Sequence, residues 1–178
     1  STLFGYIIGL PMGIVLTVTD KDGIRPNAAV YKVLDVISNL LRSIPFIILL
    51  IVLIPFTRFV VGRSYGSTAT IVPLTIAAAP YIARMVESSL KDVDAGVIEA
   101  ARSMGASDFQ IVTKVMLVEA RTSLIVGATI SLGTILGYSA MAGTVGGGGL
   151  GDIAIRYGYT RWQTDIMVVT VVLLVILF

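Results

Sequence analysis

The residues most able to form specific polar contacts lie in one short segment between two apolar runs. The stretch EAARSMGAS, residues 99–107, places the carboxylate of Glu99 three residues before the guanidinium of Arg102. On a helix this spacing brings opposite charges together. The chain contains no cysteine and no histidine, which excludes disulfide frameworks, zinc sites of the usual ligand types, and cysteine or histidine catalysis. The segment is therefore suited to noncovalent binding rather than to catalysis.

A second glycine-rich pattern resembles a nucleotide site but lacks its surroundings. Gly146, Gly148 and Gly151 satisfy G-x-G-x-x-G, which binds dinucleotides only between a strand and a helix and with a suitably spaced acidic residue. Here an apolar run precedes it, and we reject nucleotide binding. No G-x-x-x-x-G-K-[ST] motif occurs, so the chain has no P-loop for ATP. We expect no metal site, and the net charge of +2 is too small to suggest a nucleic-acid partner.

The composition is that of a protein embedded in lipid. Of the 178 residues, 56% are hydrophobic and 13% charged, which is more apolar surface than a soluble domain of this size can bury. A bilayer core of about 30 Å needs roughly 20 apolar residues per helix. We therefore predict an all-α integral membrane protein, one domain over residues 1–178, with five transmembrane helices at about 3–19, 44–61, 68–86, 124–142 and 162–178. Because the chain begins without methionine and stops inside an apolar run, we expect it to be part of a longer protein.

The basic residues give the spans an orientation. Nine of the 13 follow spans one and three, and the positive-inside rule places those segments in the cytoplasm. The chain then begins outside, and residues 99–107 are cytoplasmic. No ionisable residue is expected at a midplane, and the charged residues of the spans lie near their ends, within snorkelling reach of the interface. This counts against an ion-gradient-driven carrier.

Glycines recur at four-residue spacing in two of the spans, where absent side chains let helices approach closely in lipid. They are Gly5, Gly9 and Gly13 in span one, and Gly133 and Gly137 in span four. The pattern predicts helix packing within one subunit, with a dimer seam as the alternative. Residues 27–43 form an amphipathic pattern that we interpret as a cytoplasmic lead-in to span two.

The loop between spans three and four, about residues 91–117, predicts two short helices joined by a glycine turn. Asp92 or Asp94 can cap the first helix, Gly105 fits the left-handed position that ends it, and Ser107 with Gln110 has the pattern of a capping box. The apolar residues of the first helix share one face: Val97, Ile98, Ala101 and Met104. From this pattern alone the loop could be only a hairpin that connects two spans.

The order Glu99-Ala100-Ala101, then Gly105 and the apolar Val115, resembles the EAA loop of permease subunits of ABC importers. The family has a proline where this chain has Val118, which we interpret as a softened bend into span four. The resemblance implies that the first short helix is a cytoplasmic coupling helix that docks on an ATPase. The coupling residues it implies are Glu99, Ala100, Ala101, Arg102, Met104 and Gly105.

Longer stretches resemble the permeases of methionine importers in particular, among them LRSIPFIILLIVLIPFTRFVVG, IVPLTIAAAPYIARMVE and GGGGLGDIAIRYGY. The resemblance implies a non-catalytic subunit of a bacterial inner (plasma) membrane that forms a homodimer. It also implies two cytoplasmic ATPase subunits that bind ATP and Mg, so no cofactor belongs to this chain. An extracytoplasmic binding protein or lipoprotein would deliver methionine. A gradient-driven carrier or channel, and a membrane scaffold without transport, remain as alternatives.

The loop over residues 143–162 is expected to be an external linker with backbone freedom from its glycines. Asp152 could cap a short helix over 153–157. The loop is either a flexible connector or a contact for the binding protein. The residues of that candidate contact are Gly146, Gly147, Gly148, Gly149, Gly151 and Asp152.

Overall fold

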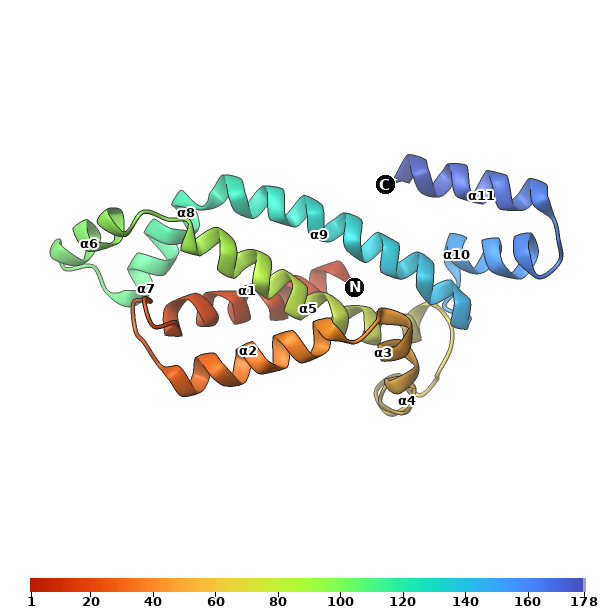
Figure 1. The fold of residues 1–178 in the computed structure, drawn as a ribbon, viewed down its shortest axis with the longest axis horizontal. Coiled ribbons are helices and arrows are strands. Elements are labelled where there is room, and N and C mark those ends of the chain that lie inside the picture. Colours follow the sequence, from red (N-terminus) through yellow and green to blue (C-terminus); the bar gives the residue numbers. More distant parts are fainter. Residues whose placement is uncertain (178) are drawn as a thin grey trace. The chain divides into compact units, whose positions relative to one another are not determined.

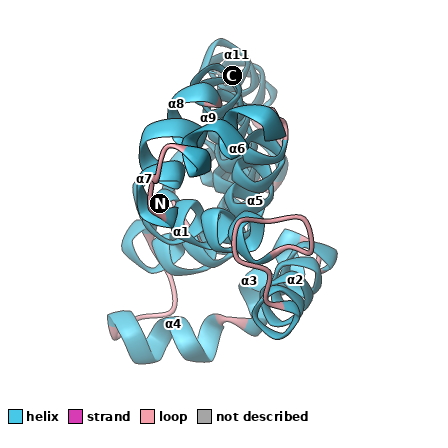
Figure 2. Ribbon diagram, turned by 90° about the vertical axis from the view of Figure 1, so that its left-hand side faces the viewer, coloured by secondary structure: helices cyan, strands magenta, loops and turns pink. Residues whose placement is uncertain are grey.

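The computed structural model describes residues 1–177, and every regular element among them is helical (Figures 1 and 2). The longer helices are α1 (Thr2–Thr19), α2 (Ala28–Ser43), α5 (Ser67–Lys91), α9 (Arg121–Ala142) and α11 (Thr164–Leu177). Shorter helices are α3 (Phe46–Val52), α4 (Ile54–Val61), α6 (Ala95–Ser103), α7 (Asp108–Gln110), α8 (Leu117–Glu119) and α10 (Gly149–Ile153). Two π-helices, η1 (Ile111–Met116) and η3 (Ala154–Tyr159), and a 3-10 turn, η2 (Gly143–Val145), complete the described chain. The prediction of an all-α protein is confirmed.

Three helical stretches are long and apolar enough to cross a membrane: α1, α5 and the run that begins with α9. A fourth is reached if α2 and α3, bent by 105° at their junction, form one broken span. Helix α11 is apolar but has 14 residues. The described chain thus supports three to four spans by length and composition.

The segment 44–61 is not the single helix that we expected from its hydropathy. It consists of α3 and α4, separated at Leu53. Prolines explain the division, because a proline lacks the backbone N–H that continues a helix. Pro45 precedes α3, and Pro55 lies in the first turn of α4, where the missing N–H leaves no intrahelical bond unmade. The long helix in this part of the chain is α2, the segment interpreted as a lead-in.

The chain forms two compact units. One contains residues 3–43 and 78–131, and the other contains residues 1–2, 44–77 and 132–178. Within the first unit, α1 packs against the second half of α5. Its centre is formed by side chains with almost no exposed surface, among them Leu16, Ile82, Ala83 and Leu90. That residues 1–178 act as one domain stays a prediction.

In the second unit the segment 143–162 is folded, which corrects the expectation of a flexible linker. It forms η2, α10 and η3. A Cβ at Gly143 or Gly151 would meet backbone atoms of Asp152 or Ala140 closer than real Cβ atoms approach. These glycines therefore allow the backbone to pack closely and do not make the segment flexible.

Backbone hydrogen bonding ties this segment to the start of α5. The N–H of Gly66 donates to the carbonyl of Gly146 at 3.0 Å, and the Thr70 hydroxyl lies 3.4 Å from the carbonyl oxygen of Gly147. Asp152 pairs with Arg156 at 3.4 Å, and no side-chain cap precedes α10, so the expected capping role of Asp152 is wrong.

Candidate functional site

The hairpin of α6 and α7 begins and turns as its sequence predicts. The Asp94 carboxylate accepts the N–H of Gly96 at 2.7 Å and caps α6. Gly105 has a φ of 83°, a left-handed conformation that costs glycine little. The N–H of Ala106 donates to the carbonyl of Ala101 at 3.1 Å, and that of Gly105 to Arg102 at 3.0 Å. This pair of bonds satisfies the last carbonyls of α6 and fixes its exit.

A reciprocal pair of hydrogen bonds begins α7. The Ser107 hydroxyl accepts from the N–H of Gln110 at 3.4 Å, while the N–H of Ser107 donates to the Gln110 side-chain oxygen at 2.9 Å. The predicted capping box is thus confirmed. With both ends of the glycine turn bonded, the angle between the two short helices is defined by local structure.

The hairpin presents an exposed apolar surface. Met104 is 82% exposed, Phe109 76% and Val97 41%, whereas Ala101 is 5% exposed and faces the chain itself. The residues expected on one face, Val97, Ile98, Ala101 and Met104, thus differ in exposure, and Ala101 alone among them is buried. Exposed large apolar side chains on a short polar hairpin are typical of a protein-binding surface. Glu99, Ala100, Arg102 and Gly105 are exposed beside them.

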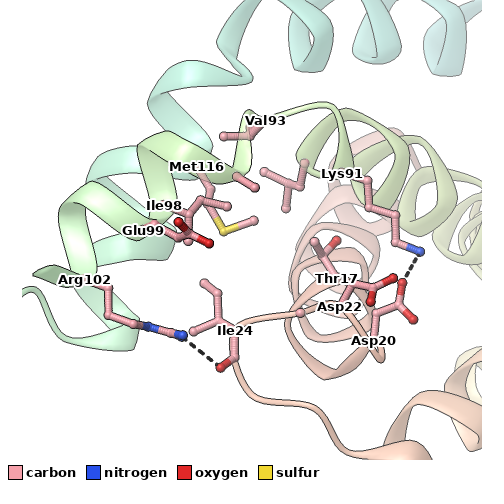
Figure 3. Close-up of a pocket in the computed structure, with 13 residues that line it drawn as sticks. Thr17, Asp20, Asp22, Ile24, Lys91, Val93, Ile98, Glu99, Arg102 and Met116 are labelled. Atoms are coloured by element: carbon pink, nitrogen blue, oxygen red, sulfur yellow. Dashed lines mark hydrogen bonds and ion pairs between the residues drawn. The ribbon is translucent and has the colours of Figure 1, made fainter.

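Arg102 bonds to a different partner from the one its spacing suggests. Among the ion pairs of residues 1–177, none joins Arg102 to Glu99. Its guanidinium instead donates to the carbonyl of Ile24 at 3.0 Å (Figure 3). Ile24 lies in the loop between α1 and α2, 78 residues away. A long-range contact of this kind has no signal in local sequence spacing.

A cavity of about 440 Å³ lies behind α6, within the first unit. It is open on one side and lined by the α1–α2 loop, the end of α5, α6 and η1. Ile98, Leu90 and Met116 provide apolar walls, and Lys91 and Arg102 lie at its edge, where each bonds to the loop (Figure 3). Two polar bonds thus join the α1–α2 loop to α5 and α6 at this cavity, and α6 also packs directly against η1.

A polar cluster on the second half of α5 joins this helix to α2. Glu87, 4% exposed, accepts hydrogen bonds from Arg84 at 2.6 Å, Lys91 at 2.8 Å and the Tyr31 hydroxyl at 3.3 Å. Arg84 also pairs with Asp35 of α2. A buried carboxylate is tolerated when it is paired and hydrogen-bonded, as Glu87 is. Glu87 is thus held inside the cluster, although its place near a span end led us to expect a side chain that snorkels to the interface.

The same cluster reaches the end of α1. Lys91 forms an ion pair with Asp20 at 2.6 Å. The hydrogen bond from Lys91, the largest cause, lowers the pKa of the Asp20 carboxyl below its usual value. Sequence analysis missed this cluster, although Arg84, Glu87 and Lys91 have the i,i+3 and i,i+4 spacing of paired charges. Their partners on α2 and in the loop after α1 are not visible in that spacing.

The glycines predicted for helix packing occupy two kinds of environment. Gly5, Gly9 and Gly13 face α5, where an added Cβ would lie 3.0 Å, 2.7 Å and 2.5 Å from the nearest atoms. Gly133 and Gly137 of α9 are half-buried, and a Cβ on Gly137 would meet nothing within 4 Å.

The candidate binding-protein contact is shaped largely by backbone requirements. Gly146, Gly148 and Gly149 have positive φ values of 78°, 76° and 80°, and Gly147 lies against Ala142 and Thr70. These glycines therefore serve the local turn, whatever else they contact. Within residues 1–177, no group of three or more acidic side chains is placed to hold a metal ion.

Comparison with known proteins relates nearly the whole chain to one family. The family model described as "Binding-protein-dependent transport system inner membrane component" matches residues 7–178. A Vibrio cholerae protein named "Probable D-methionine transport system permease protein MetI" is 50% identical over 173 residues, covering 97% of this chain and 77% of the relative. A Pasteurella multocida protein of the same name is 50% identical over 180 residues, covering 98% and 83%.

Solved structures agree with this relationship. A structure titled "Inward facing conformations of the MetNI methionine ABC transporter" is 54% identical with a TM-score of 0.97, covering 99% of this chain and 82% of that one. An amino acid ABC transporter solved with histidines has a TM-score of 0.73 at 21% identity and shows the shared fold alone.

Proposed function

The chain belongs to the family of binding-protein-dependent transport system inner membrane components, and on that premise we propose that it is the permease subunit of an ATP-driven importer of methionine. The observation that carries the substrate is similarity along almost the full chain to relatives named for D-methionine transport, with 50% identity over 97% of its residues. An ABC transporter moves its substrate by alternating access, so this subunit provides the path and not the chemistry.

The proposed assembly follows from this role. Two copies of the chain form the path, and two cytoplasmic ATPase subunits bind ATP and Mg. An extracytoplasmic binding protein or lipoprotein delivers the substrate in a bacterial inner membrane. Within the chain we propose five spans, counting α2 with α3 and α11 beside the three long stretches. The solved relative, a MetNI methionine ABC transporter, supports an ATPase partner.

We place the ATPase contact on the exposed side of α6. Glu99, Ala100, Met104 and Gly105 are available there, and Phe109 extends the apolar surface onto α7. Ala101 contributes from beneath, since its small side chain lets α6 lie close to the rest of its unit. A stiff hairpin with an exposed apolar tip suits a helix that must receive force from a partner.

Replacement of the exposed methionine tests this contact. Met104→Asp introduces a charge into an apolar interface and should release the ATPase subunits on purification, or leave them hydrolysing ATP without methionine uptake. Met104→Leu is the matched control, because it keeps the apolar volume. Normal ATPase retention and normal transport in Met104→Asp would contradict the placement of α6 in the interface.

Reconstitution tests the transport class. Vesicles with the assembly, the binding protein and methionine should accumulate methionine only when ATP is supplied on the ATPase side. Uptake that instead follows a proton or sodium gradient without ATP would establish the carrier alternative.

Single cysteines at Ser103 and Thr144 test the topology, since the chain has no other cysteine. Labelling of both from the same side of the membrane would contradict five spans.

A further inference from the structure

The loop between α1 and α2, residues 20–27, is held rigidly against the end of α1. The N–H of Gly23 donates to the carbonyl of Asp20 at 2.9 Å, that of Arg25 to Val18 at 3.0 Å, and that of Asn27 to Thr19 at 2.9 Å. A Cβ on Gly23 would collide with the backbone at the end of α1. The loop therefore moves with α1 rather than independently.

Two polar bonds join this loop to the two sides of the α5–α6 connection (Figure 3). Before the connection, Lys91 at the end of α5 pairs with Asp20 at 2.6 Å. After it, Arg102 in the last turn of α6 donates to the carbonyl of Ile24 at 3.0 Å. Only residues 92–94 separate the two helices. The loop 20–27 thus connects the two helices on either side of the short linker 92–94.

From this arrangement we propose that loop 20–27 is a brace that sets the angle between α5 and α6, with Asp20, Lys91 and Arg102 as positioning residues for coupling. The proposal rests on the proposed function, because it concerns how α6 transmits force. Without the brace, the cavity of about 440 Å³ behind α6 would leave room for the helix to tilt toward α5. With it, displacement of α6 is carried to α1 and α5 together.

The polar cluster extends the brace to a third helix. Lys91, which holds Asp20, is itself held by Glu87, and Glu87 accepts the hydroxyl of Tyr31 on α2. The ammonium of Lys91 lies 5.6 Å from the centre of the Tyr31 ring. Force on α6 can therefore reach α1, α2 and α5 through bonded contacts. A connected set of contacts of this kind can carry energetic coupling between sites, which the measurements below test.

The size of the effect follows from the exposure of the two bonds. Lys91 is 40% exposed and the Arg102 bond is exposed, so each bond contributes modestly. Removal of either should shift the equilibrium between braced and tilted α6 by roughly two- to fivefold toward the tilted arrangement. The bonds use separate atoms, so the double variant should shift it by roughly four- to twenty-five-fold.

Spin-label mobility measures the brace directly. The label is attached at Ser103→Cys, an exposed position at the end of α6 in a chain without cysteine, and the assembly is studied in nanodiscs. Asp20→Asn and Arg102→Gln should each increase label mobility, and their combination should increase it most. Asp22→Asn is the matched control, because Asp22 is 82% exposed and forms its ion pair with exposed Lys21 at 3.8 Å. Unchanged mobility in the double variant would overturn the brace.

Coupling stoichiometry tests the functional part. Asp20 is outside α6, so Asp20→Asn should retain the ATPase subunits while the ATP hydrolysed per methionine transported rises roughly two- to fivefold, and Asp22→Asn should match the wild type. Increased mobility with an unchanged ratio would overturn the positioning role. A wild-type assembly that moves no methionine with ATP would instead refute the proposed function, and the mobility measurement would still decide the brace.

Discussion

Helices α1 and α9 both carry glycines four residues apart, but only α1 has a neighbour pressed against each one within the described chain. Gly9 lies against the carbonyl of Ala79, and Gly13 against that of Ala83, where an added Cβ would be at 2.7 Å and 2.5 Å. Around Gly137 of α9 a Cβ would meet nothing within 4 Å. The same spacing thus marks a filled contact in one helix and an open position in the other.

The difference between the two helices lies in the residues that face their glycines. The neighbour of α1 is the alanine-rich part of α5, in which Ala78, Ala79 and Ala83 are buried with at most 5% exposure. Small residues on both helices permit the close approach. A glycine repeat therefore identifies the face of a helix that another helix can approach closely. Small residues at a matching spacing on a second helix identify that second helix as the partner.

The largest effect is expected where the α1–α5 contact ends in the polar cluster. Glu87→Ala would leave Arg84 and Lys91 without their shared carboxylate in a largely buried place. Removal of one partner of a buried ion pair costs about 3–5 kcal/mol when the other charge is left unpaired, and because Arg84 keeps Asp35 and Lys91 keeps Asp20 we expect the lower end of that range. We expect a lower midpoint of thermal unfolding in detergent. Asp22→Ala, at an exposed pair, is the control, and an equal stability for both variants would contradict the importance of the cluster.

The next effect tests the filled glycine contact. In Gly13→Ala the new methyl group would lie 2.5 Å from the Ala83 carbonyl oxygen and 2.7 Å from Val86 Cβ. Backbone cannot yield as a side-chain tip can, so α1 must shift, at a cost of about 1–3 kcal/mol. Thermal unfolding measures the loss. A variant as stable as the wild type would show that α1 and α5 are less closely packed than the structure has them.

A smaller effect is expected at the other end of the same contact. In Gly5→Ala the methyl group would be 3.0 Å from Ala78 Cβ and from the flexible end of Ile82. A shift of a few tenths of an ångström relieves both, so the overpacking cost offsets the gain of about 0.5–1 kcal/mol from replacing a helical glycine. The net change should be near zero by thermal unfolding. A loss as large as that of Gly13→Ala would contradict this gradient along α1.

Local patterns predicted local structure well. The cap at Asp94, the left-handed Gly105 and the capping box at Ser107 all depend on residues within four positions of one another, and all three are confirmed. The family was also recognisable from the sequence, because residues 99–105 carry its motif and longer stretches support it. The role of these residues in docking stays a proposal.

Features that depend on distant residues were not predictable in the same way. Spacing could not show that Arg102 bonds to Ile24, since that contact spans 78 positions. The division of residues 44–61 is different, because Pro45 and Pro55 are local signals of a bend that the hydropathy average passes over. Glycines in 143–151 suggested flexibility, whereas neighbouring backbone fills the space beside several of them.

A small gain in stability is expected on the α9 side and sharpens the comparison. Gly137→Ala adds a methyl group where the chain itself offers no obstacle, and it removes the helical penalty of glycine, about 0.5–1 kcal/mol. If nothing else in the assembly covers this face, the variant should be slightly more stable than the wild type, with an unchanged number of permease copies by native mass spectrometry. If α9 instead meets the second copy there, the dimer seam that the glycine spacing also allows, the methyl group would separate the two copies. Loss of the dimer with Gly137→Ala, but not with Ser139→Ala on an exposed position of the same helix, would assign Gly137 to that seam. The two glycine repeats would then share one physical use, and they would differ only in whether the neighbour belongs to the same chain.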